Sequence, residues 1–527
     1  MNKVQNTSKG RSTSPQFEKA TIASLAPELL SIIFKFVHDG SPQTNKPRDV
    51  PPSWTMKIDE DLEWAVNALV HPDLECVDFQ SPTLFPYSLA AVSPYWSEIL
   101  SSYPEFWTLV VFFIDSRHTS LAEASLILKR SRKLPIHVVI TRREGFRVRK
   151  HPDLHEKCQI AALVDILQPH WRRCESLHID AHLSSSLPVV PTDFSLFDVA
   201  PQLFLLELIP DCLDEQENHG RQEGQEGQEG QEDEEEREER EDILARFYTT
   251  RSEFAPGLRF LVVDGHNFRR GNEELELWIP NDSNLEYLTV VRHHPPASST
   301  EEEPYTLTNF CNQLDDFASL RYLKLQDIRF KYYAGPHLTY DLSVQYLHLV
   351  EVESDFIDAF FEWMPQLSLS VLHITRSSLP KYEGVENATL ILEEITPECD
   401  LHDALGSWEG ETLCIDNCKQ FSDQVLEEMA YVLGPVPEDG EPEVCMSAPC
   451  LRRLILCRLS ELSIRALKAL VDLRNRMVDY NHPNWRTTTS FGPAIRSLAV
   501  VHCKVETLSA ADEQWFRSRL VEFYWVN

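Results

Sequence analysis

The chain has 527 residues, a hydrophobic fraction of 42% and a formal net charge of −34, with 26 Phe and 12 Cys. A chain of this length holds roughly two to four domains, and its apolar content is that of a globular protein with an ample core. The negative charge argues against non-specific binding to nucleic acid or to an anionic membrane surface, because Lys and Arg hold phosphate groups.

Residues 1–20 are polar and lack the apolar region of a signal peptide, so we predict a disordered tail there. No run of about 18 apolar residues occurs, so no transmembrane helix is expected. Both features favour the cytoplasm, the nucleus or both, where thiols stay reduced. The cysteines include no Cys-x-x-Cys motif, and the sequence predicts neither a metal site nor a cofactor.

Two apolar segments near the N-terminus have the spacing of helices. The first covers residues 25–37, where Pro27 suits the first turn of a helix. The second covers residues 87–100, and Pro94 is expected to break it into two helices. An insertion at about residues 38–83 separates them. Neither segment can bury its apolar face alone, so together they predict a small module that docks on a partner.

Residues 108–170 are predicted to form a linking α/β segment. Strands are expected at residues 109–114 and 134–140, and helices at 120–133 and 158–167. Two short basic clusters, at residues 129–133 and 142–150, are interpreted as solvated charged faces rather than as a basic patch.

From residue 171 onward a short motif recurs: an apolar residue, two variable residues, Leu, one variable residue and another apolar residue. Helices are expected between some copies, at residues 355–364, 422–433 and 462–474. A short strand followed by a helix is the unit of a leucine-rich-repeat solenoid, where each unit buries its apolar face on the next. An irregular leucine-rich-repeat-like solenoid over residues 171–527 is therefore favoured over an ordinary α/β domain. The copies lie at residues 174–179, 203–208, 258–263, 285–290, 320–325, 344–349, 369–374, 390–392, 413–415, 451–456 and 495–500.

A Glu-rich segment at residues 213–242 interrupts the repeats. Repulsion between like charges and the lack of apolar residues predict a disordered acidic loop. We interpret it as a solvated insertion, and the alternative is an acidic arm that attracts basic partners.

No motif in the sequence indicates catalysis. It contains no Gly-rich phosphate loop, no Gly-x-Ser-x-Gly and no His-Glu-x-x-His, so we predict that the protein is not an enzyme. His293 and His294 precede Pro295 and are predicted to lie in a loop.

Tyr287, Tyr322 and Tyr346 hold the same place in three repeats, directly before the central Leu. Alternate side chains of a strand point to opposite faces, so these rings are expected on the solvent-exposed concave side. Exposed aromatic side chains on neighbouring strands would form a stripe that binds a target protein. The alternative is that the rings pack against flanking strands or helices.

The N-terminal segments carry Pro27-Glu28-Leu29-Leu30 and Ile33-Phe34, then Val92, Trp96 and Ile99, and finally Pro104 and Trp107. Over residues 22–37 and 84–107, this pattern resembles the F-box in the form abundant in fungi. The repeats extend the resemblance to an F-box/leucine-rich-repeat architecture. The implied fold is mixed α/β, with a small three-helix F-box module at residues 21–107 followed by the irregular solenoid of short parallel strands and helices.

The resemblance implies a non-catalytic substrate-recognition subunit of a Skp/cullin/F-box-type E3 ubiquitin ligase. Such a subunit docks on the Skp-type adaptor, reaches the cullin through it, and holds a protein target of unknown identity with its repeats. The alternative is a protein-binding repeat scaffold with a degenerate F-box, because of the insertion and because Ala26, Pro94 and Ser97 depart from the family pattern. The adaptor-binding positions that the resemblance implies are Pro27, Leu29, Leu30, Ile33, Phe34, Val92, Trp96 and Ile99.

Overall fold

The structure is a computed structural model, and it describes a subset of the 527 residues. The predicted tail (1–20), nearly all of the predicted insertion (about 38–83) and the predicted acidic loop (213–242) lie outside the described residues. The described residues are 25–40, 84–115, 117–143, 154–189, 200–212, 255–269, 284–294, 305–315, 317–330, 342–364, 367–379, 386–395, 401–406, 408–430, 448, 450–477 and 494–526.

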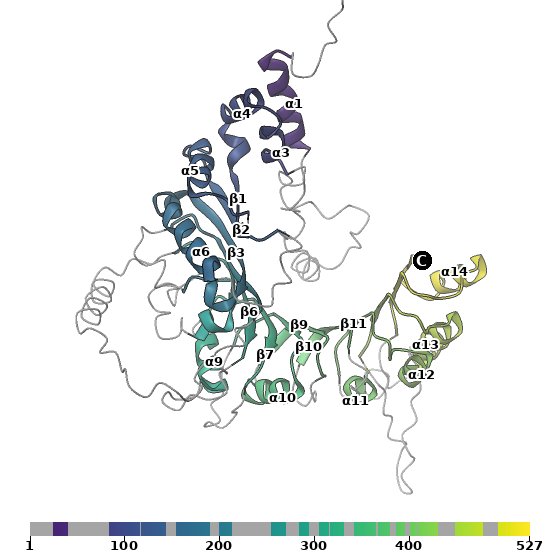
Figure 1. The fold of residues 1–527 in the computed structure, drawn as a ribbon. Coiled ribbons are helices and arrows are strands. Elements are labelled where there is room, and N and C mark those ends of the chain that lie inside the picture. Colours follow the sequence, from purple (N-terminus) through teal and green to yellow (C-terminus); the bar gives the residue numbers. More distant parts are fainter. Residues whose placement is uncertain are drawn as a thin grey trace, which may run out of the picture.

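Fourteen short strands form one open parallel sheet, and each strand pairs with the strand that follows it in the sequence (Figure 1). This confirms the prediction of a mixed α/β fold with short parallel strands. The strands are β1 Leu109–Phe113, β2 Ile136–Thr141, β3 Cys174–Leu183, β4 Leu205–Cys212, β5 Phe260–Asp264, β6 Tyr287–His293, β7 Tyr322–Ile328, β8 Tyr346–Val350, β9 Ser368–Thr375, β10 Glu386–Glu393, β11 Thr412–Asp416, β12 Arg453–Cys457, β13 Ser497–Val501 and β14 Glu522–Val526.

The helices lie mainly along the outer, convex side of the curved sheet, with α1, α3 and α4 beyond its first strand (Figure 1). Among the described residues, no helix combines the length and the apolar character needed to cross a bilayer. The helices are α1 Pro27–Asp39, α3 Tyr87–Ala90, α4 Pro94–Ser101, η5 Pro104–Trp107, α5 Leu121–Arg130, α6 Leu154–Leu167, η6 Gln168–Arg173, η7 Ser184–Ser186, α9 Leu307–Asp315, α10 Ser354–Trp363, α11 Leu401–Gly406, α12 Asp423–Ala430, α13 Ile464–Met477 and α14 Ala510–Arg517.

Every predicted copy of the repeat motif lies at a strand, from β3 to β13. In β7 the alternation places Leu323 and Leu325 in the core, while Tyr322 belongs to a separate cluster on the other face. Helix α10 covers the core side with a stripe of Phe356, Ile357 and Phe360, all buried. Period-2 strands and period-3.6 helices therefore bury one shared layer of side chains.

The motif does not predict β14, whose sequence Glu-Phe-Tyr-Trp-Val holds aromatic residues where the earlier strands hold Leu. The short helices α9, α11 and α14 were also not expected. His293, predicted to lie in a loop, is the buried last residue of β6.

One large apolar core runs through the described part of the chain, from Leu30 and Phe34 in α1 to Phe516 and Leu520 next to β14, and two smaller clusters lie apart from it. The predicted linking segment contributes β1 and β2 to the same sheet. The N-terminal helices and the strands are therefore continuous in their packing.

Tyr87 of α3 joins the N-terminal helices to the first edge of the sheet. Its hydroxyl donates to the carbonyl of Leu109 at 3.1 Å and accepts from the backbone N–H of Val111 at 3.0 Å. Its ring packs edge-on against Trp107 at 5.8 Å, and burial raises the pKa of the phenol. The hydroxyl thus takes the place of a neighbouring strand at the outer edge of β1.

Candidate interaction surfaces

Four of the eight predicted adaptor-binding residues form the core of the N-terminal helices. Leu30 and Phe34 of α1 and Trp96 and Ile99 of α4 are buried, and the rings of Phe34 and Trp96 meet edge to face at 5.1 Å. The hydroxyl of Ser93 accepts the N–H of Trp96 at 3.2 Å, which caps α4 directly after the predicted break. These side chains hold the helices together and are not available to a partner.

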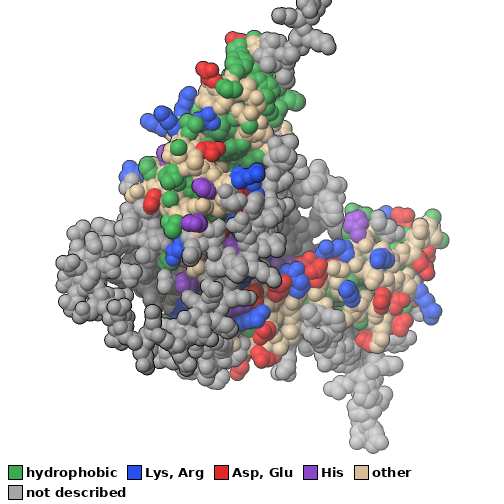
Figure 2. All heavy atoms as spheres, viewed as in Figure 1, with side chains coloured by type: hydrophobic (Ala, Val, Ile, Leu, Met, Phe, Trp, Pro, Cys, Tyr) green, Lys and Arg blue, Asp and Glu red, His purple; other side chains and the backbone are tan. Residues whose placement is uncertain are grey.

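The other four predicted residues, Pro27, Leu29, Ile33 and Val92, are exposed. They belong to a larger surface that we term the N-terminal apolar face. Green side chains gather over this end of the molecule in Figure 2. Seven of the twelve exposed large hydrophobic side chains in the described residues lie here: Leu29, Ile32, Ile33, Phe36, Val37, Val92 and Tyr95.

Helix α1 is apolar along two stripes. Leu30 and Phe34 form the buried stripe, whereas Leu29, Ile33 and Phe36 belong to a second stripe at the same helical spacing. Phe36 is 80% exposed, although a phenylalanine gains about 1.5–3 kcal/mol on burial. A contiguous exposed apolar surface of this kind is typical of a protein-binding site.

The prediction that the three tyrosines form an exposed stripe is wrong. Tyr346 is fully buried, Tyr322 is 6% exposed, and only Tyr287 is half-buried. The three rings lie side by side because their strands pair in register, Tyr287 with Tyr322 and Tyr322 with Tyr346. The predicted alternative, packing against flanking strands, is what the structure shows. Binding of a target through these rings stays a prediction.

The aromatic column begins one strand earlier than the sequence pattern indicated. Phe260 of β5 stacks on Tyr287 with the ring centres 4.4 Å apart. Tyr287 and Tyr322 are 5.8 Å apart, and Tyr322 stacks on Tyr346 at 4.8 Å. Stacked aromatic pairs add about 0.5–1.5 kcal/mol each beyond burial, so this column stiffens the centre of the sheet.

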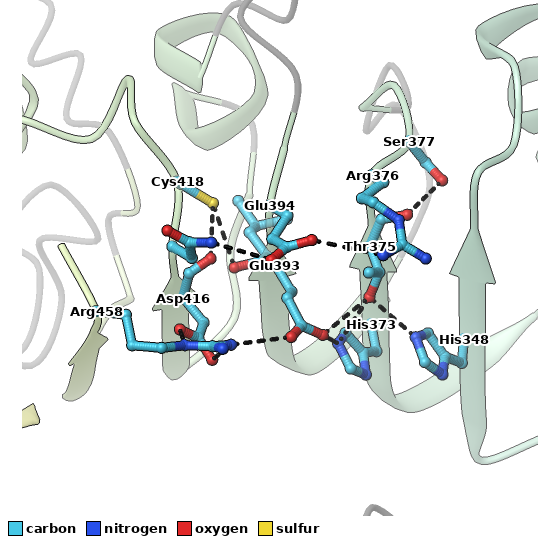
Figure 3. A network of polar contacts seen from close by, with 12 residues as sticks. His348, His373, Thr375, Arg376, Ser377, Glu393, Glu394, Asp416, Cys418 and Arg458 are labelled. Carbon is cyan, nitrogen blue, oxygen red and sulfur yellow. Dashed lines mark hydrogen bonds and ion pairs between the residues drawn. The ribbon is translucent and has the colours of Figure 1, made fainter. Parts of the chain in front are cut away.

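The sequence pattern predicts no role for two histidines that lie beside this column. His348 of β8 and His373 of β9 stack face to face at 3.9 Å (Figure 3). The hydroxyl of Tyr346 lies 3.0 Å from Nδ1 of His373, and that of Tyr322 lies 3.4 Å from Nδ1 of His348. Both phenols can donate only if each imidazole carries its proton on Nε2, and we assign these tautomers. Burial lowers the pKa of both histidines, which keeps them neutral.

The network ends on the carboxylate of Glu393, which three polar or cationic neighbours hold ionised. Nε2 of His373 lies 3.4 Å from Glu393, and the hydroxyl of Thr375 donates to the same carboxylate at 3.2 Å. Arg458 reaches it from β12 at 3.1 Å and binds Asp416 at 2.6 Å (Figure 3). The hydrogen bond from His373, aided by Thr375 and Arg458, lowers the pKa of Glu393 to about 2.

A row of polar and charged residues lines the carboxyl ends of the strands β6 to β13, and each has a positive φ of about 50°. This region of backbone space costs a non-glycine residue on the order of 1 kcal/mol. The side chains pair along the row: Arg376 contacts Glu351 at 2.8 Å and Glu394 at 3.6 Å, and Asn417 donates to Glu394 at 3.0 Å. The row consists of Arg292, Asp327, Glu351, Arg376, Glu394, Asn417, Arg458 and His502.

The interpretation of residues 142–150 as a solvated basic face is wrong for Arg142. Its guanidinium is buried and contacts Asp211 at 2.5 Å, Glu156 at 3.4 Å and Asp180 at 3.7 Å. Arg143 is paired with Asp115 at 2.7 Å. The acids lie far away in the sequence, so only the fold reveals that these arginines are neutralised.

Buried thiols connect neighbouring repeats. The thiol of Cys418 donates to the carbonyl of Leu392 at 3.4 Å, and that of Cys503 to the carbonyl of Leu456 at 3.4 Å. Ser377 holds the equivalent place after β9 and accepts the N–H of Val352 at 2.9 Å. Among the described residues, no group of three or more His, Cys, Asp or Glu side chains is arranged to hold a metal ion.

A scan against protein-family models finds no match, and a search of curated proteins finds no significant relative.

Proposed function

We propose that this chain is the substrate-recognition subunit of a Skp/cullin/F-box-type ubiquitin ligase. Its N-terminal helices act as the F-box and its sheet acts as a leucine-rich-repeat-like solenoid. The observation that carries the proposal is the N-terminal apolar face, because Pro27, Leu29, Ile33 and Val92 remain exposed while the other four F-box-like positions are buried. A helical partner with an apolar groove is the natural complement to such a face.

The repeat side of the proposal is supported by the buried Cys and Ser positions. The leucine-rich-repeat pattern places Asn or Cys three residues after its last strand Leu. Cys418 follows Ile415 by three residues, Cys503 follows Val500 by three, and Ser377 follows Ile374 by three. Their side-chain hydrogen bonds to neighbouring backbone serve the structural purpose that this position has in such repeats.

In this proposal the chain positions other proteins and catalyses no reaction itself. The N-terminal apolar face binds the Skp-type adaptor and, through it, the cullin, while the repeats hold a target protein close to the ubiquitin-carrying enzyme. Holding two reactants together raises their effective concentration, which is the source of the rate gain. The proposal implies that the protein acts in the cytoplasm or the nucleus.

Adaptor binding provides the test. The full chain with Leu29→Asp should bind a purified Skp-type adaptor at least about tenfold more weakly than the unchanged chain, because a carboxylate would be desolvated in an apolar interface. Leu126→Asp is the matched control, since Leu126 of α5 is 47% exposed and Leu29 is 51% exposed. The control should bind normally, and circular dichroism should show both variants folded.

No measurable binding of the unchanged chain to the adaptor, or equal binding of the Leu29→Asp variant, would defeat the proposal. Capture of other proteins in that case would favour the scaffold with a degenerate F-box. Trp96→Ala is unsuitable as a test because Trp96 packs on Phe34 in the module core, so its loss would unfold the helices.

A further inference from the structure

The last strand of the sheet, β14, has one edge without a neighbouring strand among the described residues. In a parallel pair, the N–H and C=O of alternate residues point to the same neighbour. The N–H of Glu522 donates to Arg496 and the carbonyl of Val526 accepts from His502, so residues 522, 524 and 526 face β13. The backbone groups of Phe523 and Trp525 therefore point outward.

The two ends of the sheet differ in how their edges are closed. At β1, the Tyr87 hydroxyl binds the outer backbone of Leu109 and Val111, and Thr119 exchanges hydrogen bonds with Phe113. At β14, no hydrogen bond from a described residue reaches the outer N–H or C=O of Phe523 or Trp525. An unprotected edge is a template for another extended strand.

The side chains around this edge are apolar and incompletely covered. Phe523, Tyr524, Trp525 and Val526 are each half-buried, and the preceding Val521 is 80% exposed. The indole N–H of Trp525 has no hydrogen-bond partner in the described residues. The edge of β14 therefore presents apolar side chains that the described residues do not fully cover.

We propose that β14 pairs with β14 of a second copy of this chain, antiparallel and about a two-fold axis through Tyr524. In this register, Phe523 faces Trp525 of the second copy, and each such pair exchanges both of its outward hydrogen bonds. Tyr524 meets its own copy on the axis as a non-hydrogen-bonded pair. The symmetric arrangement is closed, because one surface serves both copies and leaves no edge to extend.

The sequence of β14 is self-complementary in this register. The only charged residue of the strand, Glu522, lies opposite Val526 of the second copy and not opposite its own copy. Like charges directly opposite each other would be destabilising, and aromatic pairs across strands are favourable. A parallel pairing would need a head-to-tail contact that does not close, so the antiparallel dimer is the arrangement that the strand fits.

The mass of the full chain in solution provides the test, measured by sedimentation equilibrium up to about 100 μM, where a micromolar interface is saturated. Tyr524→Lys sets two lysines against each other on the axis and should weaken dimerisation by at least about tenfold. Val526→Lys is the matched control on the same strand and face. It sets lysine opposite Glu522 of the second copy, so the dimer should be kept.

A cysteine at the axis tests the register directly. Cα atoms in a non-hydrogen-bonded pair lie about 4.5 Å apart, which suits a disulfide. Tyr524→Cys should form a covalent dimer under mild oxidation, and peptide mapping should find residue 524 joined to residue 524. A monomer at every concentration, equal effects of the two lysine variants, or no link between the two cysteines would overturn the proposal. These readouts do not involve the adaptor, so they stand apart from the proposed function.

Discussion

Tyr346 uses its hydroxyl for a hydrogen bond inside the protein. This aromatic side chain of the concave face is therefore not available to a partner. Tyr346 is fully buried and its hydroxyl lies 3.0 Å from Nδ1 of His373, while the hydroxyl of Tyr322 lies 3.4 Å from Nδ1 of His348. A buried imidazole nitrogen left without a partner would cost about 1–3 kcal/mol, so the four side chains support one another. The repeat motif locates these rings on one face, but their burial depends on histidines from other strands.

His293 is the buried titratable group with the clearest consequence for stability. Its ring lies 4.8 Å from Phe330 and 5.2 Å from Tyr305, and its Nδ1 is 3.3 Å from the carbonyl of Gly265. The backbone segments at Gly265 and His293 approach so closely that a Cβ on Gly265 would lie 2.3 Å from the Cα of His293, so only glycine fits there. Burial lowers the pKa of His293 to about 4.

We predict that the free energy of unfolding falls as the pH drops from 6.5 to 4. Above pH 6.5 the imidazole is neutral in both states, whereas between the two pKa values only the unfolded chain binds the proton. The loss from His293 is about 3 kcal/mol when complete. Urea unfolding at about pH 7.5 and about pH 5 should detect about 2 kcal/mol of this loss, because pH 5 lies between the two pKa values.

His293→Gln should show a smaller fall between these pH values than the unchanged chain. Some fall should remain, because burial also lowers the pKa of His348 and His373. His118→Gln, at an exposed position, should leave the fall unchanged. An identical fall in the His293→Gln variant would contradict the assignment of this proton to His293.

At the scale of elements, α1 carries more apolar surface than its own module can cover. One stripe packs on α4 through Phe34 and Trp96, and the other stripe contains Ile32 and Phe36, which stay exposed. Propensity and periodicity predict the helix, and it begins two residues later than expected, at Pro27. They cannot divide the apolar residues between core and surface, because both stripes have the same spacing.

The coupling of α3 to β1 depends on a single hydroxyl. Tyr87→Phe would leave the carbonyl of Leu109 and the N–H of Val111 without their partner, which should cost about 1–3 kcal/mol. Hydrogen exchange measured by NMR or mass spectrometry should show faster exchange of the Val111 amide. Tyr103→Phe is the control, because the hydroxyl of Tyr103 makes no hydrogen bond to a described residue. The Val111 amide should exchange at an unchanged rate in this variant. Equal protection of Val111 in both variants would show that the hydroxyl does not close this edge.

At the scale of the whole molecule, the two proposed interfaces lie at opposite ends of the sheet (Figure 1). The N-terminal apolar face lies beyond β1, whereas β14 forms the other edge. One continuous core joins the two ends of the sheet. Distant sites without shared partners are expected to act independently.

We therefore predict that each substitution affects one assay only. Leu29→Asp should reduce adaptor binding and leave the sedimentation mass unchanged, and Tyr524→Lys should do the reverse. Each variant is measured in both assays at matched concentration, with the unchanged chain alongside. Loss of both activities in one folded variant would show that the two ends are coupled.

Local sequence patterns predict the strands β1 to β13, the break at Pro94 and the parallel stacking of successive repeats, but they do not predict β14. Period-2 and period-3.6 patterns are local, and a strand followed by a helix can bury its Leu residues only against the next repeat. Tertiary structure alone decided which of the F-box-like residues stay exposed, that Tyr346 is buried, and that Arg142 is neutralised. These depend on side chains brought together from distant strands and helices, and no local pattern encodes such contacts.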